Sequence, residues 1–247
     1  MKYFAKIKYL GTAFHGFQVQ PDCRTVMSEL SCALEQALGA PSRITGCSRT
    51  DAGVHANEFC LTVECPTATV PPDKLPVAVA RYMPADLSLF YAEACSDEFH
   101  PRYDVVSKEY LYRIVTSPIF DPFLFGRVFF TPRKLDDAAI ERMRSAASHF
   151  VGKHDFSAFM SEGSDVVDTV RDVKYLEIDR FENEIDIRIC ADGFLYNMVR
   201  IIVGTLLDCA YGRTSPADIP DIIRSKDRSR AGMTAPAEGL YLNKVSY

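Results

Sequence analysis

The sequence lacks several features that mark particular classes of protein. No pair among its eight cysteines has the C-x-x-C spacing of a zinc site or redox motif, and the nearest pair is Cys60 and Cys65. The longest apolar run near the C-terminal end, IIVGTLL, is far shorter than the roughly 20 residues that span a bilayer. The first residues, MKYFAKIKYLG, carry lysines where a signal peptide would be apolar. We therefore expect a cytoplasmic protein without membrane contact, whose cysteines are mostly buried thiols.

The chain also lacks a strong excess of charge and any low-complexity segment. It has 28 Lys and Arg against 33 Asp and Glu, a net charge of −5, which argues against a protein whose whole surface binds nucleic acid. A local basic groove is still compatible with this balance. With 247 residues, 47% of them hydrophobic, the chain can form one large domain or two small ones.

Hydrophobic periodicity predicts strands and helices that occur in a similar order in two halves of the chain. The first half, residues 1–103, is expected to hold strands at Lys2–Leu10, in RITGCS and EFCLTVEC and at Leu87–Ala94, a helix ending at Gly39, and a short helix near Pro72–Arg81. The second half, residues 104–247, is expected to hold the elements that follow. These are strands at Lys108–Thr116 and in EGLYLNKVSY, a hairpin turning at Glu182-Asn183, and helices in KLDDAAIERMRSAASHFVG, YNMVRIIVGTLLDCAYG and SPADIPDIIRSKDRS. Strands joined as hairpins predict an α+β fold with antiparallel sheets over a parallel, doubly wound one.

The stretch GCSRTDAGVHA, between two of the expected strands, carries the residues with the clearest chemical potential. Asp51 can project from a turn in which Gly53 supplies backbone freedom, and Arg49 beside it would favour the carboxylate. Such a carboxylate can act as a nucleophile or remove a proton from carbon. The structural alternative is that Asp51 only ties the turn by accepting backbone hydrogen bonds. A metal site with His55 lacks a third ligand at matching spacing.

Five motifs in order resemble the tRNA pseudouridine synthase A family over essentially the whole chain. They are GTAFHGFQVQ, RTDAGVHA, FHPRYDVVSKEYLYRI, FLYNMVRIIVGTLL and APAEGLYL. The chain differs from the family's common pattern at Leu10, where an aspartate is frequent, and at Ser48, where a glycine is frequent. The resemblance implies a pseudouridine synthase fold, in which two similar halves meet at a central cleft and helices lie on the outer faces.

The resemblance also implies roles for four residues. Asp51 matches the catalytic aspartate, Arg200 the arginine that pairs with it, Tyr110 the tyrosine that packs on the target base, and Arg49 the residue that helps displace the target nucleotide. The implied reaction converts uridine to pseudouridine at positions 38, 39 and 40 of the tRNA anticodon stem-loop. It implies no cofactor and no metal, and it implies a homodimer in which one tRNA touches both subunits.

The chemistry of these side chains suits that reaction. The target nucleotide must leave its stem, and Arg49 could fill the vacated space and hold a phosphate. Asp51 would then attack the base or the sugar, or remove a sugar proton, and charge-assisted hydrogen bonds from Arg200 would orient it. Arg200 lies in an apolar helical run, where an unpaired cation is costly, so it needs an anion. Tyr110 could stack on uracil, although an aromatic residue on an alternating strand is ordinarily a core residue.

Two other functions remain open from the sequence. One is a non-catalytic RNA-binding relative, which would have no need of Asp51. The other is a small hydrolase that uses Ser48 or Cys47 with His55, although the G-x-S-x-G elbow is absent. The basic stretch Arg224–Arg230, with Arg102, Lys108 and Arg49, could rim a groove for phosphates, or it could be a solvated helix end.

Overall fold

The computed structural model describes residues 1–163 and 166–247, which form two compact units. The first unit comprises Met1–Val106 and Tyr241–Tyr247, and the second comprises Ser107–Leu240. The expected division between residues 103 and 104 lies close to the boundary after Val106. The last strand, expected in the second half, clusters with the first unit because β10 (Leu240–Ser246) pairs in parallel with β3 (His55–Glu64).

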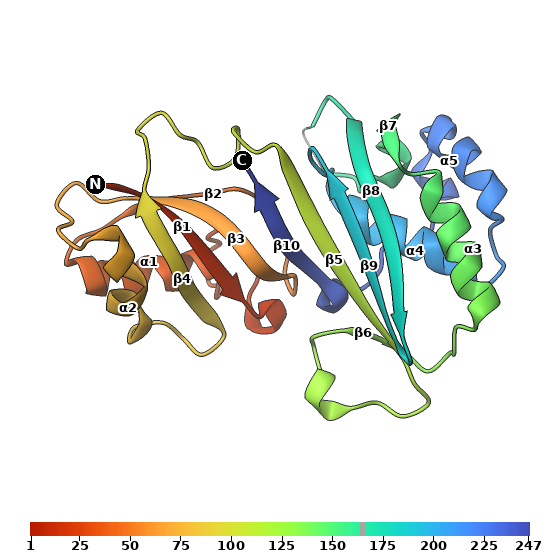
Figure 1. Cartoon of the computed structure of the whole chain (residues 1–247), viewed down its shortest axis with the longest axis horizontal. Coiled ribbons are helices and arrows are strands. Elements are labelled where there is room, and N and C mark those ends of the chain that lie inside the picture. The colour runs from red at the N-terminus through yellow and green to blue at the C-terminus, as the bar shows by residue number, and fades with distance from the viewer. Residues whose placement is uncertain (164–165) are drawn as a thin grey trace. The chain divides into compact units, whose positions relative to one another are not determined.

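The sheet of the first unit has the order β4-β1-β3-β10, and β2 pairs with the far part of β3 (Figure 1). β1 (Lys2–Tyr9) runs antiparallel to both β3 and β4 (Leu87–Ala94), and β2 (Arg43–Gly46) is antiparallel to β3. Two helices complete the unit: α1 (Val26–Leu38), and α2 (Leu75–Ala80), which contacts both α1 and β4. Side chains of β1 and β3 supply much of the buried core of this unit, and both strands bury several consecutive residues.

The helix α1 shows how local sequence fixes the ends of an element. Thr25 caps its first turn and forms a reciprocal capping box with Ser28, whose hydroxyl accepts from the Thr25 N–H. Gly39 ends the helix in the left-handed conformation, at φ 71°. One face of the helix is apolar, and four of its residues are buried: Val26, Leu30, Ala33 and Leu34.

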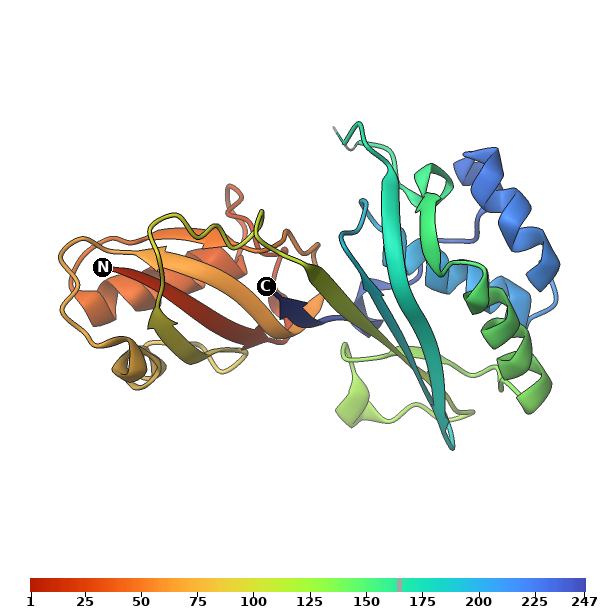
Figure 2. The same cartoon turned by 45° about the horizontal axis from the view of Figure 1, so that its top comes forward.

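The second unit combines a sheet of order β5-β9-β8-β7 with helices on one side of it (Figures 1 and 2). The strands are β5 (Ser107–Thr116), β6 (Phe129–Thr131), β7 (Gly152–Asp155), β8 (Val170–Phe181) and β9 (Glu184–Ala191), and β6 pairs in parallel with β5. The helices are α3 (Asp137–Ser148), α4 (Met198–Ala210) and α5 (Ile219–Ser225). α3 packs on α4 and β8. The mixed strands and separate helices confirm the predicted α+β class.

The predicted hairpin at Glu182-Asn183 is confirmed, but the predicted helix over SPADIPDIIRSKDRS is wrong in its extent. Glu182 adopts a left-handed conformation (φ 52°) between β8 and β9. The stretch from Ser215 to Ser229 instead forms two 3₁₀ turns around α5, which ends where Lys226 is left-handed (φ 56°). The side chain of Asp227 then caps the second turn, so the chain cannot continue as one helix.

The cysteines and the helix lengths bear on two of the expectations from the sequence. Five of the eight cysteines are buried thiols that form no disulfide, namely Cys47, Cys60, Cys65, Cys190 and Cys209, whereas Cys32 is exposed. Within residues 1–163 and 166–247, no helix has the length and apolar character needed to cross a membrane.

Candidate active site

Asp51 lies in the tight turn that leads from β2 into β3. Its side chain is half-buried, and its carbonyl oxygen accepts a hydrogen bond from the Val54 N–H at 3.2 Å. Gly53 has φ 80°, a conformation that glycine adopts without the steric cost that a Cβ would bring. The sequence therefore forms a compact turn that presents one carboxylate at the start of β3.

The segment between β1 and α1 holds this turn through backbone contacts. The Phe17 N–H donates to the Thr50 carbonyl at 3.1 Å, and the Gly53 N–H donates to the Phe14 carbonyl at 3.2 Å. Gly16, at φ 81°, passes so close that a Cβ there would lie 2.5 Å from the Thr50 carbonyl oxygen. Two motifs that are separate in the sequence thus form one structural element around Asp51.

His55 is part of the scaffold of this element. Its side chain is 0% exposed, its Nδ1 accepts a hydrogen bond from the Gly11 N–H at 2.8 Å, and its ring stacks on Tyr241 at 4.4 Å. A Cβ on Gly11 would meet the Val54 carbonyl oxygen at 2.0 Å, so only glycine allows this approach. Because Nδ1 is already an acceptor, it is not available as a base or a metal ligand.

The hydrolase and metal alternatives gain no support from the geometry. Cys47 is 0% exposed and so is closed to a substrate. Ser48 is half-buried, but the His55 Nδ1 already accepts from Gly11 and cannot activate its hydroxyl. Among the residues that the structure describes, no group of three or more His, Cys, Asp or Glu side chains is arranged to hold a metal ion. Arg49 is exposed.

Arg200 lies in the first turn of α4, near the start of the apolar helical run in which it was expected. Asn197, in the left-handed conformation at φ 60°, precedes the helix and accepts from an Arg200 terminal nitrogen through Oδ1 at 2.9 Å. The Arg200 Nε donates to the Ala235 carbonyl at 2.6 Å, and the Ala235 N–H donates to the Arg200 carbonyl at 3.0 Å. These bonds fix the guanidinium between the start of α4 and the segment before β10.

Tyr110 and Tyr112 lie on the same face of β5. Tyr110 is 7% exposed and meets the ring of Phe194 edge-on at 5.0 Å. The Tyr112 hydroxyl donates to the Pro236 carbonyl at 2.8 Å, next to the residue that accepts from Arg200. Burial raises the pKa of Tyr112 above its usual value, and Arg200 opposes this shift. The segment at Pro236 therefore links the tyrosine strand to the arginine helix within the second unit.

The four residues of the candidate site are divided between the two units. Asp51 and Arg49 belong to the first unit, and Tyr110 and Arg200 belong to the second. The pairing of Asp51 with Arg200 and the stacking of Tyr110 on a base stay predictions. Sequence reasoning missed Asn197 as an anchor for Arg200, although it lies in the quoted FLYNMVR motif.

The basic stretch Arg224–Arg230 is partly neutralised within its own unit. Arg224 pairs with Asp221, and the Lys226 ammonium lies 2.7 Å from an Asp155 carboxylate oxygen. Arg228 donates to the Ala231 carbonyl and the Thr234 hydroxyl at 3.3 Å each. A solvated helix end accounts for much of this stretch, which is a weaker indication of a phosphate groove than its composition suggested.

Comparisons with known proteins assign the chain to a family. Residues 5–104 and 146–247, most of the chain, match the family described as tRNA pseudouridine synthase. A tRNA pseudouridine synthase A from Bacillus licheniformis is 42% identical over 249 residues, covering 100% of this chain and 99% of the relative. A tRNA pseudouridine synthase A 2 from Clostridium tetani is 38% identical over 244 residues, covering 98% and 97%. Among solved structures, the chain is similar to one in a Cbf5-Nop10-Gar1 complex at a TM-score of 0.38 and 13% identity, with 82% of this chain and 43% of that chain covered.

The chain belongs to the tRNA pseudouridine synthase family. It is accordingly an isomerase that acts on uridine in tRNA, and its α+β architecture is the pseudouridine synthase fold.

Proposed function

We propose that the protein converts uridine to pseudouridine at positions 38, 39 and 40 of the tRNA anticodon stem-loop, with Asp51 as the nucleophile. The relatives are named tRNA pseudouridine synthase A, and the chain matches them over nearly their full length, which supports this assignment. The single observation that supports Asp51 is its place on a turn that two backbone hydrogen bonds and the close approach of Gly16 hold rigid. A catalytic carboxylate needs such a fixed position.

The reaction is an exchange of one bond for another on the same base. The bond between ribose C1′ and N1 breaks, the uracil turns while bound, and C1′ joins C5. The proton on C5 is lost and N1 carries a proton in the product, so neither redox change nor cofactor is required. As the nucleophile, the Asp51 carboxylate forms a bond to the nucleoside when the C1′–N1 bond breaks, and that bond breaks again when C1′ joins C5. Tyr110 offers a flat ring that retains the detached base, and stacking contributes about 1–3 kcal/mol.

The remaining site residues serve the substrate and the nucleophile. Arg200 donates charge-assisted hydrogen bonds to the Asp51 carboxylate, and its contacts with Asn197 and Ala235 set the direction of its guanidinium. Arg49 is exposed and occupies the space left by the displaced nucleotide. The enzyme works in the cytoplasm as a homodimer that shares one tRNA between its subunits.

Release of tritium from tRNA labelled at uridine C5 tests this proposal, because each conversion frees one C5 hydrogen. Wild-type enzyme should release tritium, and mapping should locate pseudouridine at positions 38, 39 and 40. Asp51→Asn should abolish release and keep tRNA binding within about twofold, while Asp73→Asn, at an exposed carboxylate, should behave as wild type. Wild-type release by Asp51→Asn would refute the role of Asp51, and pseudouridine at other positions would refute the assigned sites. Sedimentation at increasing concentration would test the homodimer.

A further inference from the structure

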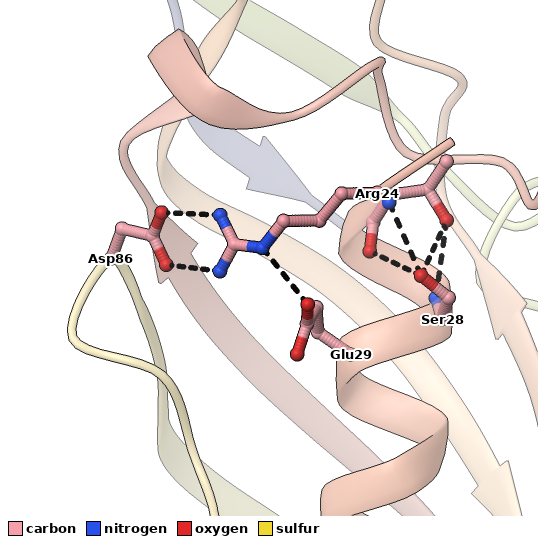
Figure 3. A network of polar contacts seen from close by, with 5 residues as sticks. Arg24, Ser28, Glu29 and Asp86 are labelled. Atoms are coloured by element: carbon pink, nitrogen blue, oxygen red, sulfur yellow. Dashed lines mark hydrogen bonds and ion pairs between the residues drawn. The ribbon is translucent and has the colours of Figure 1, made fainter. Parts of the chain in front are cut away.

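Arg24 has a dense set of ionic contacts immediately before α1. Its two terminal nitrogens lie 2.7 and 2.9 Å from the two carboxylate oxygens of Asp86, and its Nε donates to Glu29 at 2.9 Å (Figure 3). The Arg24 side chain is only 34% exposed. Hydrogen bonding from Arg24 lowers the pKa of Asp86, so the carboxylate is held ionised. This bidentate pair with a second carboxylate fixes the plane of the guanidinium.

The same guanidinium holds the segment that precedes the helix. It lies 4.3 Å from the centroid of the Phe14 ring, within the range of a cation–π contact. The backbone adds a second tie, because the His15 N–H donates to the Arg24 carbonyl at 2.8 Å. Arg24 therefore restrains Phe14 through its side chain and the neighbouring residue, His15, through its main chain.

Phe14 in turn is linked to both sides of the Asp51 turn, to one side directly and to the other through Tyr9. Its carbonyl accepts from the Gly53 N–H at 3.2 Å, and its ring meets Tyr9 edge-on at 6.2 Å. The Tyr9 hydroxyl lies 2.8 Å from the Thr50 hydroxyl in a buried environment. Thr50 and Gly53 flank Asp51 along the chain. The contact through Tyr9 therefore holds the residue before Asp51, and the bond from Gly53 to Phe14 holds the turn after it.

We propose that Arg24 is a positioning residue for Asp51, acting through Phe14 and held in place by Asp86. The inference rests on the proposed role of Asp51. Arginine suits this place because its planar fork can bind Asp86 at two points, donate to Glu29 and lie over Phe14 at once. A lysine ammonium can neutralise one carboxylate but cannot make that set of contacts. A displacement of about 1 Å at a reacting group can cost on the order of 100-fold in rate.

The test compares Arg24→Lys with a matched control, Arg188→Lys. Arg188 also has its guanidinium between two carboxylates, Glu177 and Asp179, and its side chain is 35% exposed. These three residues belong to the second unit, whereas the Asp51 turn belongs to the first. We expect Arg24→Lys to lower kcat for tritium release by about tenfold or more while KM for tRNA changes less than about twofold. Arg188→Lys should leave both constants within about twofold of wild type. A kcat near wild type in Arg24→Lys would overturn the inference.

A double-mutant cycle with Tyr9→Phe separates positioning from general weakening of the fold. If Arg24 and Tyr9 act on the same turn, their losses in kcat should be strongly non-additive, whereas independent effects would multiply and would overturn the inference. Asp51→Asn distinguishes the two levels of the proposal. Activity in Asp51→Asn would refute the proposed function and this inference together. An inactive Asp51→Asn beside an unaffected Arg24→Lys would refute the inference alone.

Discussion

Gly16 lies directly against Thr50: a Cβ at Gly16 would stand 2.5 Å from the Thr50 carbonyl oxygen and 3.3 Å from the Asp51 carbonyl carbon. Because real Cβ atoms do not approach a carbonyl oxygen so closely, any side chain at Gly16 must displace the turn that carries Asp51. The approach thus makes the position of Asp51 depend on a residue 35 positions earlier in the chain.

Gly16→Ala should therefore lower kcat in addition to destabilising the fold. Gly39→Ala is a matched control, because Gly39 also has positive φ (71°) but a Cβ there would meet nothing within 4 Å. We expect Gly39→Ala to cost about 1–2 kcal/mol of unfolding free energy for the backbone strain alone. Gly16→Ala should cost a further 1–3 kcal/mol or so and lower kcat more than about tenfold. Denaturant unfolding and tritium release measure both effects, and equal kcat values in the two variants would contradict the prediction.

Arg200→Lys should nearly abolish turnover, because a lysine cannot donate to both Asn197 and Ala235 in the arginine geometry. We expect a fall in kcat on the order of 100-fold with a small change in tRNA affinity. Arg142→Lys provides the control, since the Arg142 guanidinium likewise donates to two backbone carbonyls, those of Cys209 and Ala210. It should lose stability without losing turnover per folded molecule, and similar rates for the two variants would contradict the pairing with Asp51.

Tyr110 is expected to act through the face of its ring. Tyr110→Phe should then keep tRNA affinity and much of the rate, while Tyr110→Leu should lose about 1–3 kcal/mol of stacking in the transition state. Tyr112→Phe serves as the comparison, because it removes the hydroxyl that donates to Pro236 without touching Tyr110. Single-turnover rates of the three variants decide the matter. A severe defect in Tyr110→Phe would show that the hydroxyl, rather than the ring, has the catalytic role.

The lowered pKa of Asp86 predicts how the Arg24 contact depends on pH. The contact stabilises the folded state fully above the ordinary aspartate pKa of about 3.9, and that contribution is lost as the pH falls through the lower pKa of the folded state. Asp86→Asn should be less stable than wild type near pH 6, and the difference should shrink as the medium is acidified below about pH 4. Thermal unfolding across this range measures it. A difference that stays constant with pH would contradict the ionic contribution.

The sequence predicted the parts of the fold that have strong local signals. α1 has a stripe of apolar residues, a capping threonine and a terminal glycine, and the β8–β9 hairpin has alternation on both sides of a polar turn. β6 and β7 have only three and four residues, too few for alternation to be recognised. The sequence predicted one helix over residues 215–229, because a capping residue such as Asp227 is hard to recognise when it lies inside an amphipathic pattern.

The candidate site was predicted only in part, because only some of its residues have a local signal in the sequence. Asp51, Arg49, Tyr110 and Arg200 lie in motifs that can be read locally. Arg24 and Asp86 are 62 residues apart, and nothing near either residue indicates the other. The left-handed turn at Asn197, which precedes α4 and anchors Arg200, has no periodic signal.

The first unit consists of two separate stretches of sequence, since Tyr241–Tyr247 joins Met1–Val106 while the intervening residues form the second unit. During synthesis, the second unit is therefore complete before β10 emerges to pair with β3. Until then the ring of His55 lacks Tyr241, its stacking partner, and the start of β3 lacks its parallel partner strand. The scaffold beside Asp51 is thus completed by residues that are synthesised after the whole of the second unit, so a chain interrupted between the two would lack it.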